Sequence, residues 1–349
     1  MNRRSILQGF SASVAAVAFA AGARHSVVAQ EAAAAATPTG ERLTIYSGRN
    51  ENLVGPLIER FTAETGIEAD VRFAGTAELA VTILEEGDAS PADVFFGQDA
   101  GALGLLAEEG RFAALPDDVL SVVDARFRSP AGLWVGTSAR ARVIVYNTET
   151  YTDADLPAMV ETLVEPEWSG QVGWAPENAS FQAFVTAFRV LRGEDAARAW
   201  LEGMLANDVV SFGSSNTDIV LAVGNGEIPL GLVNHYYLYA VKAEEGDDFP
   251  IANHYLEAGD PGALINVAGA GILASGTHQE DALAFVQYLI SNEGQTYFTE
   301  STAEYAVVEG VASPVDLPPI TEVGSPEIDL SDLADLQGTV ELLTEVGAL

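Results

Sequence analysis

Apolar and polar positions follow two periods along most of this chain. Short apolar or alternating runs predict strands at 43–47, 67–73, 91–96, 172–176, 228–233 and 269–274, and two apolar runs fill 133–146. Apolar residues at helical spacing predict helices at 53–65, 78–86, 181–191, 194–206, 218–224 and 280–298. Strands that alternate with helices indicate βαβ units and a mostly parallel sheet, so we expect an α/β fold.

The apolar run 228–233 leads directly into Asn234, His235, Tyr236 and Tyr237. Ligands of open α/β sheets bind just beyond the carboxyl ends of the strands, so two phenol oxygens at such an end can face one cleft. A phenolate is a hard anionic ligand that suits Fe(III), and a bound cation can ionise a phenol whose free pKa is about 10. The alternative interpretation is that both tyrosines are amphipathic residues at a strand-helix junction.

The length of 349 residues is large for one core and suggests two domains. Residues 1–29 resemble an export signal of the twin-arginine type, with Arg3 and Arg4 before an apolar stretch and small residues at Val27 and Ala29. An ordinary secretory signal is the alternative. The Ala-rich segment 30–41 predicts a disordered spacer. The apolar stretch is shorter than the roughly 20 residues that a membrane span needs, so we expect a periplasmic or extracytoplasmic protein that is not inserted in the membrane after signal removal.

The formal net charge is −35, and Lys242 is the only lysine. Such a charge makes nucleic acid and anionic membrane surfaces poor partners, and it is most simply explained by a solvated acidic surface. The absence of cysteine excludes disulfides, thiolate metal sites and cysteine nucleophiles. The histidines after the signal, His235, His254 and His278, lie in no metalloprotease motif, and no nucleophile elbow surrounds them, so we expect no enzyme.

Several stretches taken together resemble the periplasmic ferric-ion-binding proteins, which are the solute receptors of iron ABC importers. These stretches are 43–48, 61–67, 91–95, 140–147, 226–228, 234–237, 260–263 and 291–295, and the resemblance covers essentially all of 42–349. It implies a two-lobed periplasmic-binding-protein fold of type II, in which two mixed sheets flanked by helices enclose a hinged cleft. Lobe 1 would hold 42–140 plus 267–317, and lobe 2 would hold 141–266 plus 318–349.

The resemblance also implies a ligand site. Tyr236 and Tyr237 would bind Fe(III), and a synergistic anion, carbonate or phosphate, would share the metal. The resemblance puts the contacts of this anion at Asp99, Asn178, Ser180, Asn216 and Asn234, with Arg140 or Arg142 as the residue that holds carbonate. A planar guanidinium suits this role because it pairs bidentately with an oxyanion.

The chain departs from the family pattern in the first lobe. Asn50 stands where a member of the family would carry a histidine, and Gln98 stands where some members carry a ligand glutamate. Both residues are therefore candidates for anion or cleft binding. We predict that Glu51 or an exogenous anion completes the metal shell.

By the resemblance, the protein is a monomeric extracytoplasmic receptor that delivers Fe(III) to an inner-membrane ABC permease. The alternative is a receptor of the same architecture for an organic solute such as a polyamine, thiamine or an organophosphonate. In that case the aromatic side chains would form a cage or a stacking wall around the solute.

Overall fold

The computed structural model describes residues 42–349. The predicted export signal, 1–29, and the predicted spacer, 30–41, lie outside these residues. None of the helices in the described part of the chain has the length and the apolar character that a bilayer crossing requires.

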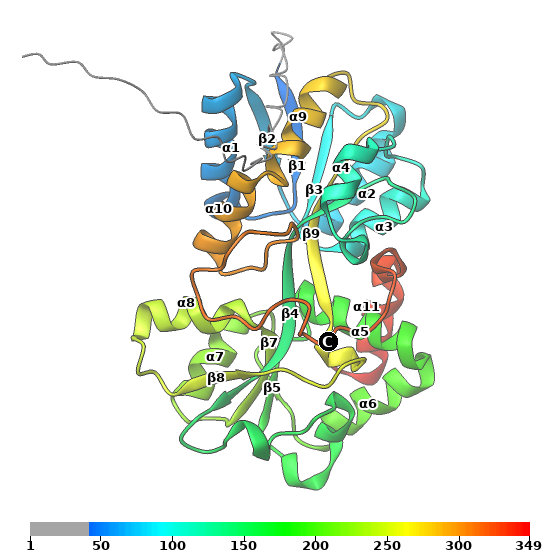
Figure 1. Ribbon diagram of the computed structural model, residues 1–349. Coiled ribbons are helices and arrows are strands. Elements are labelled where there is room, and N and C mark those ends of the chain that lie inside the picture. Colours follow the sequence, from blue (N-terminus) through cyan, green and yellow to red (C-terminus); the bar gives the residue numbers. More distant parts are fainter. Residues whose placement is uncertain (1–41) are drawn as a thin grey trace, which may run out of the picture. The chain divides into compact units, whose positions relative to one another are not determined.

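The nine strands of residues 42–349 form one hydrogen-bonded path in the order β2-β1-β3-β9-β4-β7-β5-β6, with β8 paired to β4 (Figure 1). Parallel pairs join β1 to β2 and β3, and β5 to β6 and β7. Antiparallel pairs join β9 to β3 and β4, and β4 to β7 and β8, so the sheet is mixed throughout. The strands are β1 (Leu43–Ser47), β2 (Ala69–Phe73), β3 (Val94–Gly97), β4 (Val135–Asn147), β5 (Val172–Trp174), β6 (Val210–Ser211), β7 (Leu230–Asn234), β8 (Ile251–His254) and β9 (Ile265–Ile272).

Strand β4 connects the two halves of this path. Its residues 135–141 pair with β9, and its residues 142–147 pair with β7 and β8. All thirteen residues of β4 are buried. The two apolar runs predicted at 133–146 are therefore one long strand, and the two predicted sheets share it. We call the half with β1, β2, β3 and β9 the first lobe and the half with β5, β6, β7 and β8 the second lobe.

Helices flank the sheet in both lobes (Figure 1). Helix α1 shows why the sequence predicts them: Asn50 accepts a hydrogen bond from the Asn52 N–H at its start, Val54, Leu57, Ile58 and Phe61 form its buried face, and Gly66 ends it. The helices are α1 (Glu51–Thr65), α2 (Thr76–Glu86), α3 (Ala100–Glu108), α4 (Asp117–Val122), α5 (Ala179–Arg192), α6 (Glu194–Ala206), α7 (Asn216–Gly224), α8 (Tyr236–Glu245), α9 (Gln279–Leu289), α10 (Asn292–Thr302) and α11 (Leu336–Val346).

Alternate residues of β4 supply two cores in the second lobe, because successive side chains of a strand point to opposite faces. Ile144 and Tyr146 pack with aromatic residues of α5 and α6. Val143 and Val145 pack with apolar residues of α7 and α8. The second lobe is therefore a three-layer α/β unit with β7 in its middle layer.

One predicted helix is wrong in its length. The apolar spacing of 280–298 predicts a single helix, but the structure has α9 and α10 with a break at Ser291. The hydroxyl of Ser291 donates to the Tyr288 carbonyl and accepts from the Gly294 N–H, so Ser291 caps a new helix. A Cβ on Gly294 would lie 2.3 Å from the Tyr288 carbonyl oxygen, so this tight break requires glycine.

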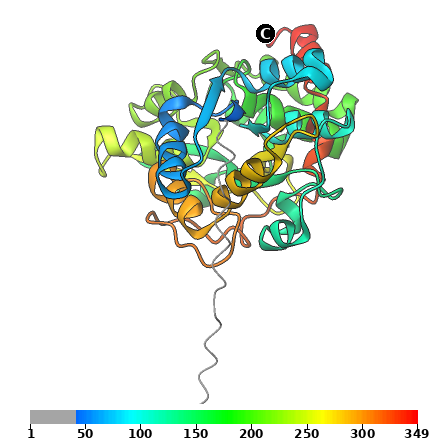
Figure 2. The same ribbon diagram turned by 90° about the horizontal axis from the view of Figure 1, so that it is seen from above.

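The C-terminal segment contacts both lobes. Val323, Leu330 and Leu333 belong to the core of the first lobe, and Leu342 and Leu343 of α11 belong to a core of the second. Figures 1 and 2 both place this segment beside α3 and α5. The predicted assignment of 318–349 to lobe 2 thus describes α11, whereas the residues before it pack on the first lobe.

Candidate metal site

The two tyrosines stand where β7 ends and α8 begins. All five residues of β7 are buried, and His235 separates its last residue, Asn234, from the first helical residue, Tyr236. The rings of Tyr236 and Tyr237 stack, with centroids 4.4 Å apart and an interplanar angle of 30°. Both residues line the same small cavity.

This cavity has a volume of about 130 Å³, which is room for a few water-sized groups. Both lobes supply its walls. The lining residues are Gln98 and Asp99 after β3, Arg140 on β4, Asn178, Ala179 and Ser180 at the start of α5, and Tyr236 and Tyr237 at the start of α8. The structure therefore brings together most of the residues that the sequence predicts for the site.

Arg140 is the arginine that lines the cavity. Its side chain is 2% exposed, and one terminal nitrogen donates to the Gln98 carbonyl oxygen. Its Nε and Nη1 atoms have no hydrogen-bond partner within residues 42–349. Burial lowers the pKa of Arg140 from its usual value, although the carboxylates of Glu304 and Asp99 oppose this effect. Two unsatisfied donors on a buried cation create a strong demand for an anionic acceptor.

Arg142 has a different environment. Its guanidinium donates to the Leu232 carbonyl at 3.1 Å and to the Ser180 hydroxyl at 3.4 Å. It also lies over the rings of Phe181 and Phe184, at 5.4 and 5.1 Å from their centroids. Burial lowers the pKa of Arg142 to about 9. Arg142 therefore supports the wall of the site from behind, whereas Arg140 lines the cavity itself.

The start of α5 also forms part of the cavity wall. Asn178 caps this helix, and its side-chain oxygen accepts from the Ser180 N–H at 2.9 Å and from the Ser180 hydroxyl at 2.7 Å. Its amide nitrogen donates to the Ser214 carbonyl at 2.9 Å. The N-terminus of a helix carries a partial positive charge that favours anions. The helix terminus and Arg140 thus lie on the walls of one cavity.

Asp99 and Gln98 are the first-lobe residues that line the cavity. Asp99 caps α3 by accepting from the Ala102 N–H at 3.3 Å. Burial raises the pKa of Asp99, while the backbone N–H of Ala102 and the charge of Arg140 act in the opposite direction. Both residues carry side-chain oxygens, which are suitable ligands for a hard cation.

The phenol of Tyr236 is protonated when no cation is bound. Burial raises the pKa of Tyr236 well above its usual value, and the neighbouring Tyr237 raises it further, whereas Arg140 lowers it. A phenol with such a pKa carries no charge at pH 7. A metal ion at the cavity would have to displace the proton, as cations do for other ligands.

Several predicted residues lie outside the cavity wall. Asn50 caps α1, and Glu51, the first residue of this helix, is exposed. Both residues line a separate hollow on the first lobe. Asn216 is buried at the start of α7 with no side-chain partner among the described residues. Asn234 pairs with Arg142 in the sheet. No group of three or more acidic or histidine side chains that could hold a metal occurs in 42–349.

Sequence reasoning missed the buried ion pair beside Arg140. Arg49 donates to both carboxylate oxygens of Glu304, at 3.1 and 3.0 Å, and both side chains are almost fully buried. Burial raises the pKa of Glu304, but Arg49 and Arg140 outweigh this effect and hold it below the usual value. The partners are 255 residues apart, so no local pattern signals the pair.

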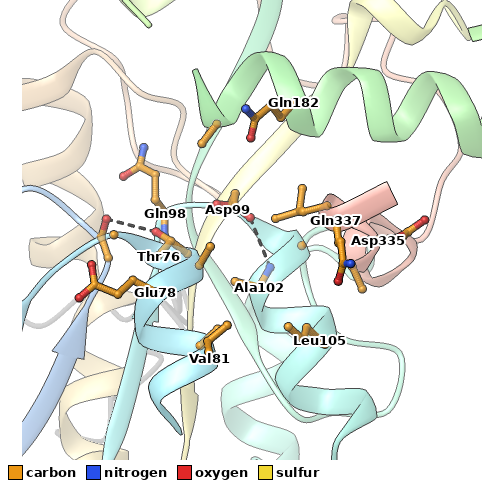
Figure 3. Close-up of a pocket in the computed structure, with 18 of the residues that line it drawn as sticks. Thr76, Glu78, Val81, Gln98, Asp99, Ala102, Leu105, Gln182, Asp335 and Gln337 are labelled. Atoms are coloured by element: carbon orange, nitrogen blue, oxygen red, sulfur yellow. Dashed lines mark hydrogen bonds between the residues drawn. The ribbon is translucent and has the colours of Figure 1, made fainter. Parts of the chain in front are cut away.

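A larger hollow of about 900 Å³ adjoins the cavity and shares Gln98, Asp99 and Ala179 with it (Figure 3). Figure 3 shows Gln182 of α5 facing the ends of α2 and α3, with Asp335 and Gln337 at one side. The hollow is lined by four acidic residues and by no lysine or arginine; the acidic residues are Glu78, Asp99, Glu108 and Asp335. A cleft lined by one sign of charge concentrates counter-ions, so this one favours cations.

Two lobes that share crossing strands and enclose a small polar cavity define an extracytoplasmic solute-binding protein. Residues 89–322 match the family model described as bacterial extracellular solute-binding protein. The chain belongs to this family. The similarity to periplasmic ferric-ion-binding proteins, predicted from the sequence, is confirmed by the relatives described next.

The chain is 37% identical over 318 residues to the Fe(3+)-binding periplasmic protein of Serratia marcescens, covering 90% of this chain and 93% of the relative. It is 33% identical to the major ferric iron-binding protein of Neisseria meningitidis, covering 93% and 98%. The structure matches iron-bound HitA from Pseudomonas aeruginosa with a TM-score of 0.79 and 35% identity, covering 88% and 99%. It also matches Trichodesmium IdiA (FutA), solved with iron and citrate ligands, with a TM-score of 0.77 and 28% identity, covering 88% and 99%.

Proposed function

We propose that this protein is the extracytoplasmic receptor of an iron ABC importer, which binds Fe(III) with an anion between its lobes and delivers it to an inner-membrane permease. The observation that carries the proposal is the shared cavity of Tyr236, Tyr237 and Arg140. The relatives are named as ferric-binding proteins, which supports the same cargo here. They are named as binding proteins, which supports a role without catalysis.

The chemistry of the cavity suits a trivalent cation. Two phenolates supply hard anionic oxygens, and they leave one positive charge of Fe(III) uncompensated. An anion held by Arg140 and the start of α5 would neutralise that charge. Because the phenols bind metal only after losing their protons, iron uptake releases protons and weakens as the pH falls.

We propose that an exogenous anion, rather than Glu51, completes the metal shell. Arg140 lines the cavity and has two donors without a partner among the described residues, whereas Glu51 lines a different hollow. Carbonate and phosphate are the anions expected from the sequence, and a neighbour binds iron together with citrate. Gln98 and Asp99 are the first-lobe oxygen donors at the cavity.

The lobes would close around the ion as hinged domains do. We propose the hinge at the point where β4 changes partner, between Ala141 and Arg142, and at the start of β9. We further propose that the protein acts as a monomer after export and that its acidic surface, the source of the −35 net charge, serves solubility.

A ferric titration of apo-protein tests this function. With bicarbonate or phosphate present, we expect a visible phenolate-to-iron absorption band that saturates at one iron per chain. Arg140→Gln should weaken iron binding roughly ten- to a hundredfold, because a hydrogen bond to a charged group is worth about 1.5–3 kcal/mol.

Arg126→Gln is the matched control, because Arg126 is an exposed arginine that pairs with Asp124 away from the cavity. This variant should bind iron like the unmodified protein. Absence of any band at excess iron would contradict the proposal. Tight binding of spermidine or thiamine by the same preparation would then favour the organic-solute alternative.

A further inference from the structure

His235 is a fully buried residue between the last residue of β7 and the first residue of α8. It directly precedes the two tyrosines. Its backbone is already helical, with φ −55° and ψ −35°, so the chain turns from strand to helix within one residue. Such an abrupt turn breaks the strand ladder, and the groups of the neighbouring strand β4 need other partners.

The imidazole of His235 makes one of the two hydrogen bonds that a strand residue would make with β4 at this point. The backbone N–H of His235 donates to the Ala141 carbonyl at 2.9 Å, as in a regular antiparallel pair. The return bond, from the Ala141 N–H, goes to Nδ1 of His235 at 3.1 Å instead of to a carbonyl. The His235 carbonyl accepts from the side chain of Asn253 at 2.9 Å. The side chain therefore extends the pairing of β4 by one residue while the backbone turns away.

The other ring nitrogen reaches the first lobe. Because Nδ1 accepts from an N–H, the ring proton is on Nε2, which donates to the Ala303 carbonyl at 2.9 Å. Ala303 has a left-handed backbone with φ 54°, and it directly follows α10. Tyr305, two residues on, packs its ring against His235 with centroids 4.7 Å apart and exchanges two backbone hydrogen bonds with Ala139 of β4.

Further contacts join α8 and Tyr255, which directly follows β8, to the same first-lobe segment. The Tyr239 hydroxyl donates to the Asp316 carbonyl at 2.8 Å, and the hydroxyls of Tyr255 and Tyr305 lie 3.3 Å apart. Figure 1 shows this segment passing from α10 to α8. The start of α8 is thus fixed to the crossing strand and to the first lobe.

We propose that His235 is a positioning residue, which sets Tyr236 and Tyr237 in place for the metal by linking the start of α8 to both β4 and Ala303. This inference rests on the proposed function. The rings need to stand close together before iron arrives, because side chains that must be ordered on binding reduce affinity. A neutral histidine suits this role, because one ring nitrogen accepts a hydrogen bond while the other, on the far side of the ring, donates one.

Two substitutions at His235 each remove one of its two ring hydrogen bonds and can keep the other. The oxygen of Asn in His235→Asn can occupy the position of Nδ1 and accept from Ala141, but the side chain is too short for Ala303. The amide nitrogen of Gln in His235→Gln can donate to the Ala303 carbonyl, but the contact with Ala141 is lost. We expect both variants to bind Fe(III) more weakly, by on the order of tenfold, in competition with citrate. The phenolate-to-iron band at saturation should also shift or broaden in both.

His254→Asn is the matched control. His254 is a buried histidine of the second lobe that bonds through both ring nitrogens, to Asp153 at 2.7 Å and to the Pro157 carbonyl at 3.0 Å, and it has no contact with the tyrosines. This variant should lose thermal stability yet keep the affinity and the band of the unmodified protein. Tyr305→Leu, which removes the ring that packs against the imidazole and so loosens its hold on Ala141 and Ala303, serves if the His235 variants do not fold. It should shift the band in the same direction.

Unchanged affinity and an unchanged band in the folded variants at 235, or in Tyr305→Leu if those do not fold, would overturn the inference, even if their melting temperature falls. A purely structural histidine would give that result. Absence of the band in the unmodified protein would instead overturn the proposed function, so the two failures are distinguishable.

Discussion

At the scale of single residues, packing decides which arginine of β4 faces the cavity. Arg140 and Arg142 are two positions apart in a strand, so both side chains lie on one face. The aromatic rings of α5 cover Arg142 from that face, whereas Arg140 lines the cavity and has two nitrogens without a partner among the described residues. From the sequence, either arginine could be the anion ligand, because the aromatic rings that distinguish the two come from a helix distant in the chain.

A buried carboxyl pair in the second lobe should make stability depend on pH. Asp260 is 2% exposed and accepts from the N–H groups of Val160 and Gly262. Burial, together with the neighbouring Glu161 carboxylate, which accepts a hydrogen bond from the protonated Asp260, raises the pKa of Asp260 to about 7. The folded protein therefore keeps this proton over a range where the unfolded chain, with an ordinary pKa of about 4, has lost it.

The sign of the pH effect follows from this proton. Since the folded state binds it more tightly, the free energy of unfolding falls as the pH rises from about 4 to about 7, by on the order of 1 kcal/mol per pH unit. Glu161→Gln can donate to Asp260 and still accept from Arg192, which now bonds Glu161 at 2.9 Å. This variant should lose most of the pH dependence in that range.

Denaturant unfolding at several pH values measures this effect. Glu167→Gln, an exposed residue in the same segment, is the control and should follow the unmodified protein at every pH. Parallel curves for Glu161→Gln and the unmodified protein would show that the pair does not share a proton.

At the scale of elements, the contact between α3 and the short helical turn η7 (Leu330–Ala334) depends on glycine. A Cβ on Gly104 would lie 2.5 Å from the Ser331 carbonyl oxygen, and one on Gly101 would lie equally close to that of Leu333. The backbone of η7 therefore rests directly on α3. This contact attaches the C-terminal segment to the first lobe before α11 reaches the second.

Gly104→Ala should destabilise the protein although alanine favours a helix. We expect a loss of about 1–3 kcal/mol, the usual cost of overpacking, because the blocking atoms belong to a backbone. Gly55→Ala in α1 is the matched control, because its nearest neighbour would be the Glu51 side chain at 3.8 Å. That variant should gain roughly 0.5–1 kcal/mol. Equal effects of the two substitutions in denaturant melts would contradict the close packing of η7 on α3.

The junction of β7 and α8 shows what an element boundary can hide. The apolar run predicts the strand, and the tyrosines suggest the change to a helix. Neither pattern indicates that His235 continues the pairing of β4 with its ring. That contact depends on a strand nearly a hundred residues earlier, with a sequence separation of 94.

At the scale of the whole chain, local patterns were sufficient for most of the fold in 42–349. Hydrophobic periodicity located most of the strands and helices, because each buries one face or one stripe. It missed α3, whose residues are apolar on nearly every side, and it merged α9 with α10, because a serine cap does not disturb the spacing of apolar residues. The family resemblance supplied the two-lobed arrangement, which periodicity alone does not give.

The site was predictable to a lesser extent. The tyrosine pair is a local signal, and Gln98, Asp99, Arg140, Asn178 and Ser180 came from the resemblance and meet at the cavity. Glu51 was chosen for its oxygen and its place in the chain, yet α1 directs it to another hollow. The charges that surround Arg140 depend on the pairing of Arg49 with Glu304, which only the folded chain brings together.

Iron content is the most direct measurement of the central claim. The protein and its double variant, Tyr236→Phe with Tyr237→Phe, are purified from the cells that export them and analysed for metal. The account predicts close to one iron per chain in the unmodified protein and a loss of nearly all of it in the double variant, with the fold intact by circular dichroism. Unchanged iron content in the double variant would contradict it, because the metal would then lie away from the two phenols.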